Sequence, residues 1–140
     1  MKHLLVLFAM TLCACARPDY LPETPAVNNE QNDPQSTCPL YFSKENICAE
    51  LIWKQNPTST DFSEFELRFN SAVAAENLSV ILWMPSMGHG SSPVKIESLG
   101  DGKFRVFKVF FIMPGDWEIR IVLKDTQTTR DQVFVPLVVP

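Results

Sequence analysis

The sequence predicts an all-β fold, an immunoglobulin-like β-sandwich of about seven strands. Three observations lead to this prediction. After Cys38, several short segments alternate apolar and polar residues with the period of two that is typical of a strand. Residues that favour turns separate these segments about every ten residues, as is common in sandwiches. No segment repeats its apolar residues with a helical period.

Each expected strand rests on a local pattern. Segment 62–69 alternates phenylalanine and leucine with charged residues, and segment 78–84 places its apolar side chains on one face. Segment 117–124 likewise places Trp117, Ile119, Ile121 and Leu123 on one face. Pro136 lies inside the last segment, which is therefore expected at a sheet edge, because proline cannot donate to a hydrogen-bond ladder. Turns are expected at 100–102, which is Gly-Asp-Gly, and at 125–130. The expected strands cover residues 47–54, 62–69, 78–84, 93–98, 103–113, 117–124 and 133–139.

The composition is that of one globular domain. The chain has 140 residues, of which 46% are hydrophobic, enough to build a single core. The formal net charge is −4 and the basic residues form no stripe, so nucleic acid is not an expected partner. No nucleophile is paired with a base in the sequence, so we do not expect an enzyme and assign no catalytic residues.

The N-terminus has the features of a bacterial lipoprotein signal. A short basic start precedes an apolar run over 4–10 that is too short to span a bilayer. The run leads into Leu12-Cys13-Ala14-Cys15, which resembles a lipobox, the motif in which a cysteine is acylated and the chain is cut before it. We therefore predict a signal peptide over 1–14 and a lipid on Cys15. The alternative is an ordinary secretory signal that is cut near Ala16.

A linker is expected to separate the lipid from the folded domain. Residues 15–37 are rich in proline, asparagine and acidic residues, a composition that buries little and favours a flexible linker. The domain itself is expected over 38–140. The lipid would anchor the protein to a membrane of the cell envelope. Ala16 stands where an aspartate would favour retention at the inner membrane, so the expected location is the outer membrane, facing the periplasm.

Two cysteines remain for the domain itself. In an oxidising compartment, Cys38 and Cys48 are expected to form a disulfide. The alternative is a redox or metal-binding pair, but their spacing is not CxxC.

Methionine and histidine gather in two segments that are candidates for a metal site. Met84, Met87 and His89 lie within Trp83-Met84-Pro85-Ser86-Met87-Gly88-His89-Gly90, and Met113 lies in Ile112-Met113-Pro114-Gly115-Asp116-Trp117. Thioethers are soft ligands that suit Cu(I) and need no deprotonation, and imidazole suits both copper oxidation states.

The expected topology brings these two segments together. Met84 ends the expected strand 78–84, and Met113 ends the expected strand 103–113, where it continues the face of Phe107, Val109 and Phe111. In an up-and-down arrangement these two strands run the same way, so both methionines would lie at one end of the sandwich. The alternative is that Met84 and Met113 only fill the core, as methionine often does.

The same segments resemble the YtkA-like and FixH-like family of small exported immunoglobulin-like domains. The residues that carry the resemblance are Met84-Pro85-Ser86-Met87-Gly88-His89-Gly90, Gly102-Lys103-Phe104 and Met113-Pro114-Gly115-Asp116-Trp117. FixH-like proteins are associated with the maturation of copper-containing respiratory oxidases. The resemblance implies that Met84, Met87, Met113 and His89 are copper ligands.

The expected function is therefore copper handling in the envelope. The protein would bind copper, mainly Cu(I), and deliver or buffer it, with a copper acceptor or another envelope protein as partner. The alternative is a metal-free β-sandwich that docks an envelope protein through an edge strand or through the same end of the sandwich.

Overall fold

The structure is a computed structural model that describes residues 38–126 and 128–140. The predicted signal peptide 1–14, and Cys15 with its linker 15–37, lie outside the described residues. Within the described part of the chain, no helix is both long and apolar enough to cross a bilayer.

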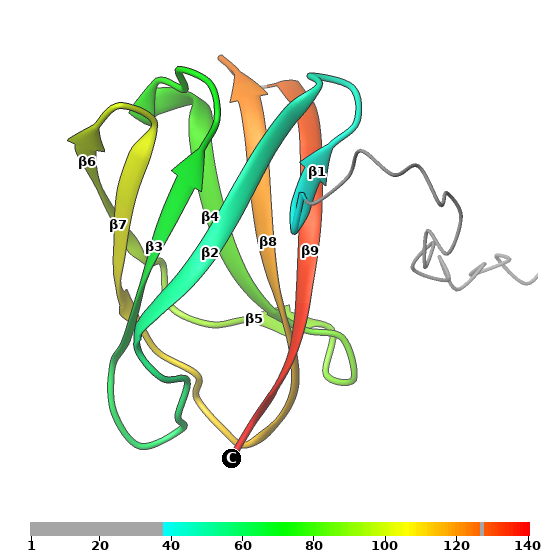
Figure 1. The fold of residues 1–140 in the computed structure, drawn as a ribbon. Helices are drawn as coiled ribbons and strands as arrows, with labels where there is room; N and C mark the ends of the chain where they lie inside the picture. The colour runs from blue at the N-terminus through cyan, green and yellow to red at the C-terminus, as the bar shows by residue number, and fades with distance from the viewer. Residues whose placement is uncertain (1–37, 127) are drawn as a thin grey trace, which may run out of the picture. The chain divides into compact units, whose positions relative to one another are not determined.

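Two antiparallel sheets form the layers of a sandwich, as Figure 1 shows. The all-β prediction is thus confirmed, with more strands than expected. One sheet has the order β1-β2-β3-β7-β6 and the other has the order β5-β4-β8-β9. In chain order the strands are β1 (Leu40–Phe42), β2 (Ile47–Gln55), β3 (Ser63–Phe69), β4 (Leu78–Met84), β5 (His89–Gly90), β6 (Lys95–Gly100), β7 (Lys103–Val109), β8 (Gly115–Asp125) and β9 (Thr128–Val139), with one 3₁₀ turn, η1 (Ala75–Asn77), before β4.

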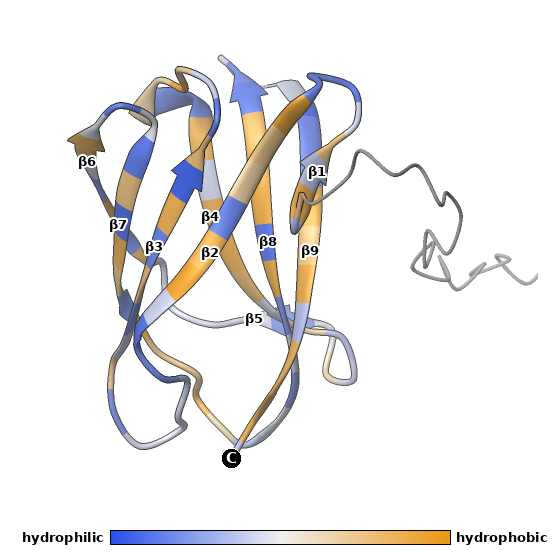
Figure 2. Cartoon of the chain, in the orientation of Figure 1, coloured by the Kyte–Doolittle hydropathy of each residue, from blue (hydrophilic) through white to orange (hydrophobic). Residues whose placement is uncertain are grey.

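The core lies between the sheets and is filled by the alternating residues of both. Figure 2 shows this alternation as bands of opposite hydropathy along the strands. The faces predicted for β3, β4 and β8 are confirmed, because their alternating apolar residues point inward. The residues between them point outward, and they are charged in β3 but include Ile81 and Trp83 in β4. The residues of these strands that belong to the hydrophobic core are Phe65, Leu67, Phe69, Leu78, Val80, Leu82, Met84, Trp117, Ile119, Ile121 and Leu123.

Two strands were missing from the sequence prediction, and both are short. β1 has three residues, and β5 has two. In β1, Phe42 is fully buried and packs against Phe69 with ring centroids 5.8 Å apart. Strands of this length contain too few residues to show a period, so their pairing partners define them.

β7 also departs from the prediction, because it ends at Val109 and not at Met113. β7 carries one residue more than β3 between the pairs Phe65–Val106 and Ser63–Val109, so it contains a bulge. Lys108, within the bulge, has a left-handed φ of 56°. As a result Val106 and Val109 both point into the core, whereas Phe107 lies outside under the guanidinium of Arg105. The predicted inward face of Phe107 is therefore wrong.

β9 is an edge strand, as Pro136 predicted. It begins at Thr128, so the turn expected over 125–130 is shorter than the sequence suggested. Near the start of β9, Asp131 connects this strand to the β1–β2 turn through hydrogen bonds. This carboxylate is only 4% exposed and accepts hydrogen bonds from the backbone N–H groups of Lys44, Glu45 and Gln132. The two sheets are thereby linked along this edge.

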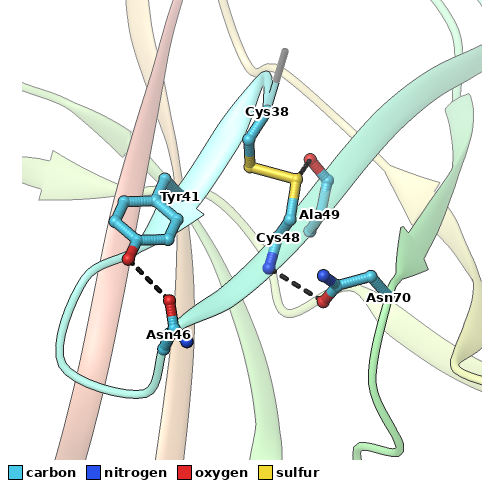
Figure 3. Close-up of a disulfide and its surroundings, with 6 residues drawn as sticks. All are labelled: Cys38, Tyr41, Asn46, Cys48, Ala49 and Asn70. Atoms are coloured by element: carbon cyan, nitrogen blue, oxygen red, sulfur yellow. Dashed lines mark hydrogen bonds between the residues drawn. A yellow bond between two sulfur atoms is a disulfide. The ribbon is translucent and has the colours of Figure 1, made fainter. Parts of the chain in front are cut away.

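A disulfide joins Cys38 to Cys48, with the two Cα atoms 5.7 Å apart, as the sequence predicted. It connects the start of the described domain to β2 (Figure 3). The backbone N–H of Cys48 donates to the side-chain oxygen of Asn70 at 2.9 Å, and Asn70 N–H donates to Cys48 O. Tyr41 closes the β1–β2 turn by donating to the Asn46 side-chain oxygen. The disulfide thus holds β1 in place at the sheet edge.

The exposed face of the first sheet carries a ladder of ion pairs. Arg105 binds Glu64 through two hydrogen bonds of 2.8 and 2.7 Å, and it lies 3.6 Å from Glu97. Glu66 pairs with Lys54 at 3.1 Å and with Arg68 at 2.5 Å. The hydrogen bonds from Arg105 hold the pKa of Glu64 below its ordinary value.

Removing the disulfide should lower stability. In a Cys38→Ala/Cys48→Ala variant, the free energy of unfolding should fall by about 2–3 kcal/mol, because the unfolded chain gains the entropy of an open loop. Urea denaturation measures this difference. A reducing agent should reproduce the loss in the parent chain and leave the variant unchanged. Equal stability of the two proteins would show that the disulfide is dispensable.

Replacing Arg105 with leucine should raise the pKa of Glu64, because the carboxylate loses both hydrogen bonds and the nearby positive charge. A carbon-13 NMR titration of the glutamate carboxyls measures this change. Because the folded pKa is lowered, the pair stabilises the fold above the unfolded pKa of about 4.3, and this contribution is lost as pH falls through the folded pKa. An unchanged titration of Glu64 would contradict this account.

Candidate functional site

Met84 and His89 face each other across the β4–β5 hairpin. Met84 is the last residue of β4, and Pro85 after it ends the regular ladder. The Met84 carbonyl accepts hydrogen bonds from the N–H of Met87 at 3.2 Å and of Gly88 at 3.0 Å. Gly88 has a φ of 67°, which lets the chain return within a tight turn. The first residue after the turn is His89, which pairs with Met84.

β5 lies unusually close to β4. A Cβ at Gly90 would lie 2.9 Å from the Leu82 carbonyl oxygen, so only glycine fits there. Directly opposite residues of an antiparallel pair project from the same face, so His89 lies on the face from which Met84 enters the core. His89 Nδ1 is 3.2 Å from its neighbour's carbonyl oxygen. With the proton on Nδ1, this contact is a hydrogen bond and Nε2 keeps a lone pair for a ligand.

Met87 is in a very different environment from Met84, although both belong to the same hairpin. The Met84 side chain is 3% exposed, whereas that of Met87 is 57% exposed. Ser86 and Gly88 flank Met87, and both are small. The Met87 thioether is therefore open to solvent, and packing does not explain why this residue is a methionine.

Met113 lies in the β7–β8 loop over residues 110–114 and is partly buried against the core. Two hydrogen bonds hold this loop. The indole N–H of Trp117 donates to the Met113 carbonyl at 3.0 Å, and the Ser91 hydroxyl donates to the Phe110 carbonyl. Phe111, between them, is fully buried and meets the Trp117 ring edge-on at 5.3 Å. Met113 thus belongs to a loop that is fixed on both sides.

The start of β8 connects the two methionine segments. Gly115 has a φ of 131°, which disfavours any residue with a side chain, and a Cβ there would lie 3.1 Å from the Met84 methyl carbon. The space beside Gly115 is therefore occupied by the Met84 thioether. Trp117, two residues later, binds the carbonyl of Met113. Met84 and Met113 both lie against this short stretch of β8.

The four residues singled out in the sequence therefore lie at the same end of the sandwich. Figure 1 shows the β4–β5 turn, the β7–β8 loop and the chain's C-terminus at this end. The sulfur atoms are not gathered in one shell, because Met84 is inside and Met87 outside. Among the described residues, no three His, Cys, Asp or Glu side chains form a metal-binding group.

Two hollows, of about 440 and 340 Å³, lie at the opposite end, beside the connection from β3 to η1. Both are lined by Ser71, Ala72 and Val73, and neither includes a methionine or His89. They are thus separate from the methionine and histidine residues.

Sequence reasoning missed an apolar surface on the exposed face of the second sheet. The Arg120 guanidinium lies between Trp83 and Phe134, 4.6 and 5.3 Å from their ring centroids, and it is also held by Glu118. Val138 on the same face of β9 is 72% exposed. The signal was present in the sequence as apolar residues at outward positions of the strands, but it could be seen only once the strand pairing was known.

The contrast between Met84 and Met87 predicts a large effect on stability for one substitution and almost none for the other. Met84→Ala should lower the free energy of unfolding by about 2–5 kcal/mol, because it leaves a cavity beside Gly115. Met87→Ala should change it by less than about 0.5 kcal/mol, because the side chain is in water. Urea denaturation of both variants tests this, with Leu99→Ala as a second exposed control. A large loss for Met87→Ala would mean that its side chain packs.

Comparison with known proteins agrees with this architecture. None of the curated proteins compared with the chain matches its sequence significantly. Residues 49–122 match the model of the YtkA-like family, and this match begins in β2, ends in β8 and includes the whole β4–β5 hairpin and the β7–β8 loop. Since the match covers more than half of the 140 residues, the chain belongs to the YtkA-like family.

Proposed function

We propose that this protein binds Cu(I) through Met84, Met87, His89 and Met113 and delivers or buffers it in the cell envelope. The observation that supports this most is the β4–β5 hairpin. It places an imidazole opposite one thioether and a second thioether in the turn between them. Three thioethers and one imidazole are a soft, uncharged ligand set that suits Cu(I).

Binding one ion with all four ligands requires a local movement. Met84 is buried, so its sulfur must turn toward the rim or the hairpin must open. β5 has only two residues, and its hydrogen bonds are few, so its opening costs little compared with unfolding of the sandwich. The β7–β8 loop, by contrast, is fixed to β8 by the hydrogen bond from the Trp117 indole to the Met113 carbonyl. The proposal is therefore that the hairpin moves onto Met113.

The proposed setting is the bacterial envelope. Cys15 would carry a lipid, and the linker 15–37 would hold the domain away from an outer membrane that it faces from the periplasmic side. The partner would be a copper acceptor in the same compartment, possessing thioether, thiolate or imidazole ligands to which Cu(I) can be transferred. Maturation of a copper-containing oxidase is one process that would use such a carrier.

A Cu(I) competition titration tests the proposal. The full chain would carry Cys13→Ser and Cys15→Ser in every sample, so that free thiolates do not bind copper, with ascorbate as a reductant that spares the disulfide. One equivalent of Cu(I) should bind, and Met84→Leu/Met87→Leu/Met113→Leu should weaken binding by about tenfold or more, equivalent to 1.4 kcal/mol. His89→Gln should weaken it less. Cooperative unfolding of each variant shows that it is folded. No binding by the folded parent chain would overturn the proposal.

The exposed apolar face of the second sheet supports a second candidate function, a metal-free module that docks an envelope protein. An exposed apolar surface on a single domain often indicates a binding site. Here Phe134 and Val138 are exposed on β9, and the guanidinium of Arg120 lies over the rings of Trp83 and Phe134. Met87→Leu separates the two functions. The change should weaken copper binding in a carrier and have no effect in a metal-free module, while folding is unaffected in both.

A further inference from the structure

Met87 combines two properties that the other methionines of the domain do not share. It is 57% exposed, and it lies in a turn whose neighbours are too small to shield it. We propose that Met87 is a site of reversible oxidation by peroxide, and that its oxidation releases Cu(I). The second part rests on the proposed function.

The chemistry is a two-electron oxygen transfer. The thioether sulfur of Met87 attacks one oxygen of hydrogen peroxide, the O–O bond breaks, a sulfur–oxygen bond forms, and water leaves. The sulfur is oxidised to the sulfoxide and the peroxide is reduced to water. Reversal uses a thiol-dependent sulfoxide reductase, which returns the oxygen as water while two thiols become a disulfide.

Burial decides which sulfur reacts. Met84 is 3% exposed, and Met113 is partly buried in a loop that is fixed by hydrogen bonds. A polar sulfoxide at Met84 would place an unpaired oxygen in the core and therefore cost stability, and the partial burial of Met113 restricts the access of peroxide to its sulfur. At Met87 the new oxygen remains in water. Among the methionines that the structure describes, the fold thus directs oxidation to Met87.

The turn can accept the modified residue without changing shape. Its conformation depends on backbone hydrogen bonds from Met87 and Gly88 to the Met84 carbonyl and on the left-handed Gly88. None of these groups belongs to the Met87 side chain. The protein should therefore stay folded after oxidation, so that the effect is confined to the copper ligands.

The consequence for copper follows from ligand softness. A thioether is a soft donor for Cu(I), whereas the sulfoxide is polar and no longer offers a thioether lone pair. Met87 is also the candidate ligand that is exposed before any movement, so it is the first sulfur that an arriving or departing ion meets. Oxidation of Met87 by peroxide should therefore lower the affinity of the site for Cu(I).

Peptide mass mapping tests the oxidation. The metal-free full chain with Cys13→Ser and Cys15→Ser is treated with dilute hydrogen peroxide, and sulfoxide is measured at each methionine over time. Met87 should oxidise about tenfold faster than Met84, and a sulfoxide reductase with dithiol should reverse it. In urea, all methionines should oxidise at similar rates. Oxidation of Met84 as fast as Met87 in the folded chain, or a Met87 that is protected until the chain unfolds, would overturn the inference.

The Cu(I) competition titration then tests the regulation. Oxidised protein should bind Cu(I) about tenfold more weakly than untreated protein, and repair should restore affinity. Met87→Leu should make the affinity insensitive to peroxide. A matched control, Leu99→Met in the Met87→Leu background, moves an exposed thioether to a different strand, where its oxidation should not affect copper.

The outcomes separate the two proposals. Equal affinity of the oxidised and untreated chains overturns the regulatory role while copper binding stands. No copper binding by the untreated chain overturns the proposed function and the release of copper with it, and the mass map alone then decides whether Met87 is the oxidation site.

Discussion

The end of the sandwich that carries the methionines depends on the placement of Trp117. Its side chain is 1% exposed, its indole donates to the Met113 carbonyl, and its ring packs edge-on against Phe111. A buried indole N–H needs an acceptor, so the loop after β7 must return over the core. Gly115, just before it, leaves the space that the Met84 thioether fills. One aromatic residue and one glycine thus bring together two segments that are about thirty residues apart in the chain.

The outer faces of the two sheets differ in chemistry, since one carries ion pairs and the other carries exposed apolar residues. Ion pairs around Arg105 and Glu66 cover the face of β2, β3 and β7. The face of β4, β8 and β9 carries the stacked Arg120 and exposed apolar residues, and its β4 strand leads into the candidate copper hairpin. A partner on this second face would contact Trp83, the residue next to Met84. Copper binding and protein docking are therefore compatible uses of one side of the domain.

The sequence was sufficient for the parts of the fold that have a clear period. Alternation located β3, β4 and β8 and assigned their inward faces, and Pro136 identified an edge strand. The alternation of apolar and polar residues did not predict the elements whose structure depends on pairing with a neighbouring strand. β1 and β5 are too short to show a period, and the bulge at Lys108 places Phe107 and Val109 on opposite faces within a segment that looks regular. The disulfide was predictable from the number of cysteines and the expected compartment.

For the candidate site, the sequence indicated the residue types and the structure shows their different burial. Nothing in the spacing of Met84 and Met87 distinguishes a buried sulfur from an exposed one, because Met84 ends a strand whereas Met87 lies in the turn that follows it. That difference is the basis of both proposals, the movement that copper binding would require and the selective oxidation of Met87. The sequence was thus sufficient to propose the ligand types, but not to show which sulfur is accessible first.

The most direct test of the account is carbon-13 methyl NMR of the methionines during Cu(I) addition. The methyl signals of Met84, Met87 and Met113 and the ring signals of His89 should all shift, and all should saturate at one equivalent. That result would show one site that draws in the buried Met84. If only Met87 and His89 shift, while Met84 and Met113 keep their signals, copper is held at the surface and the two inner methionines are core packing.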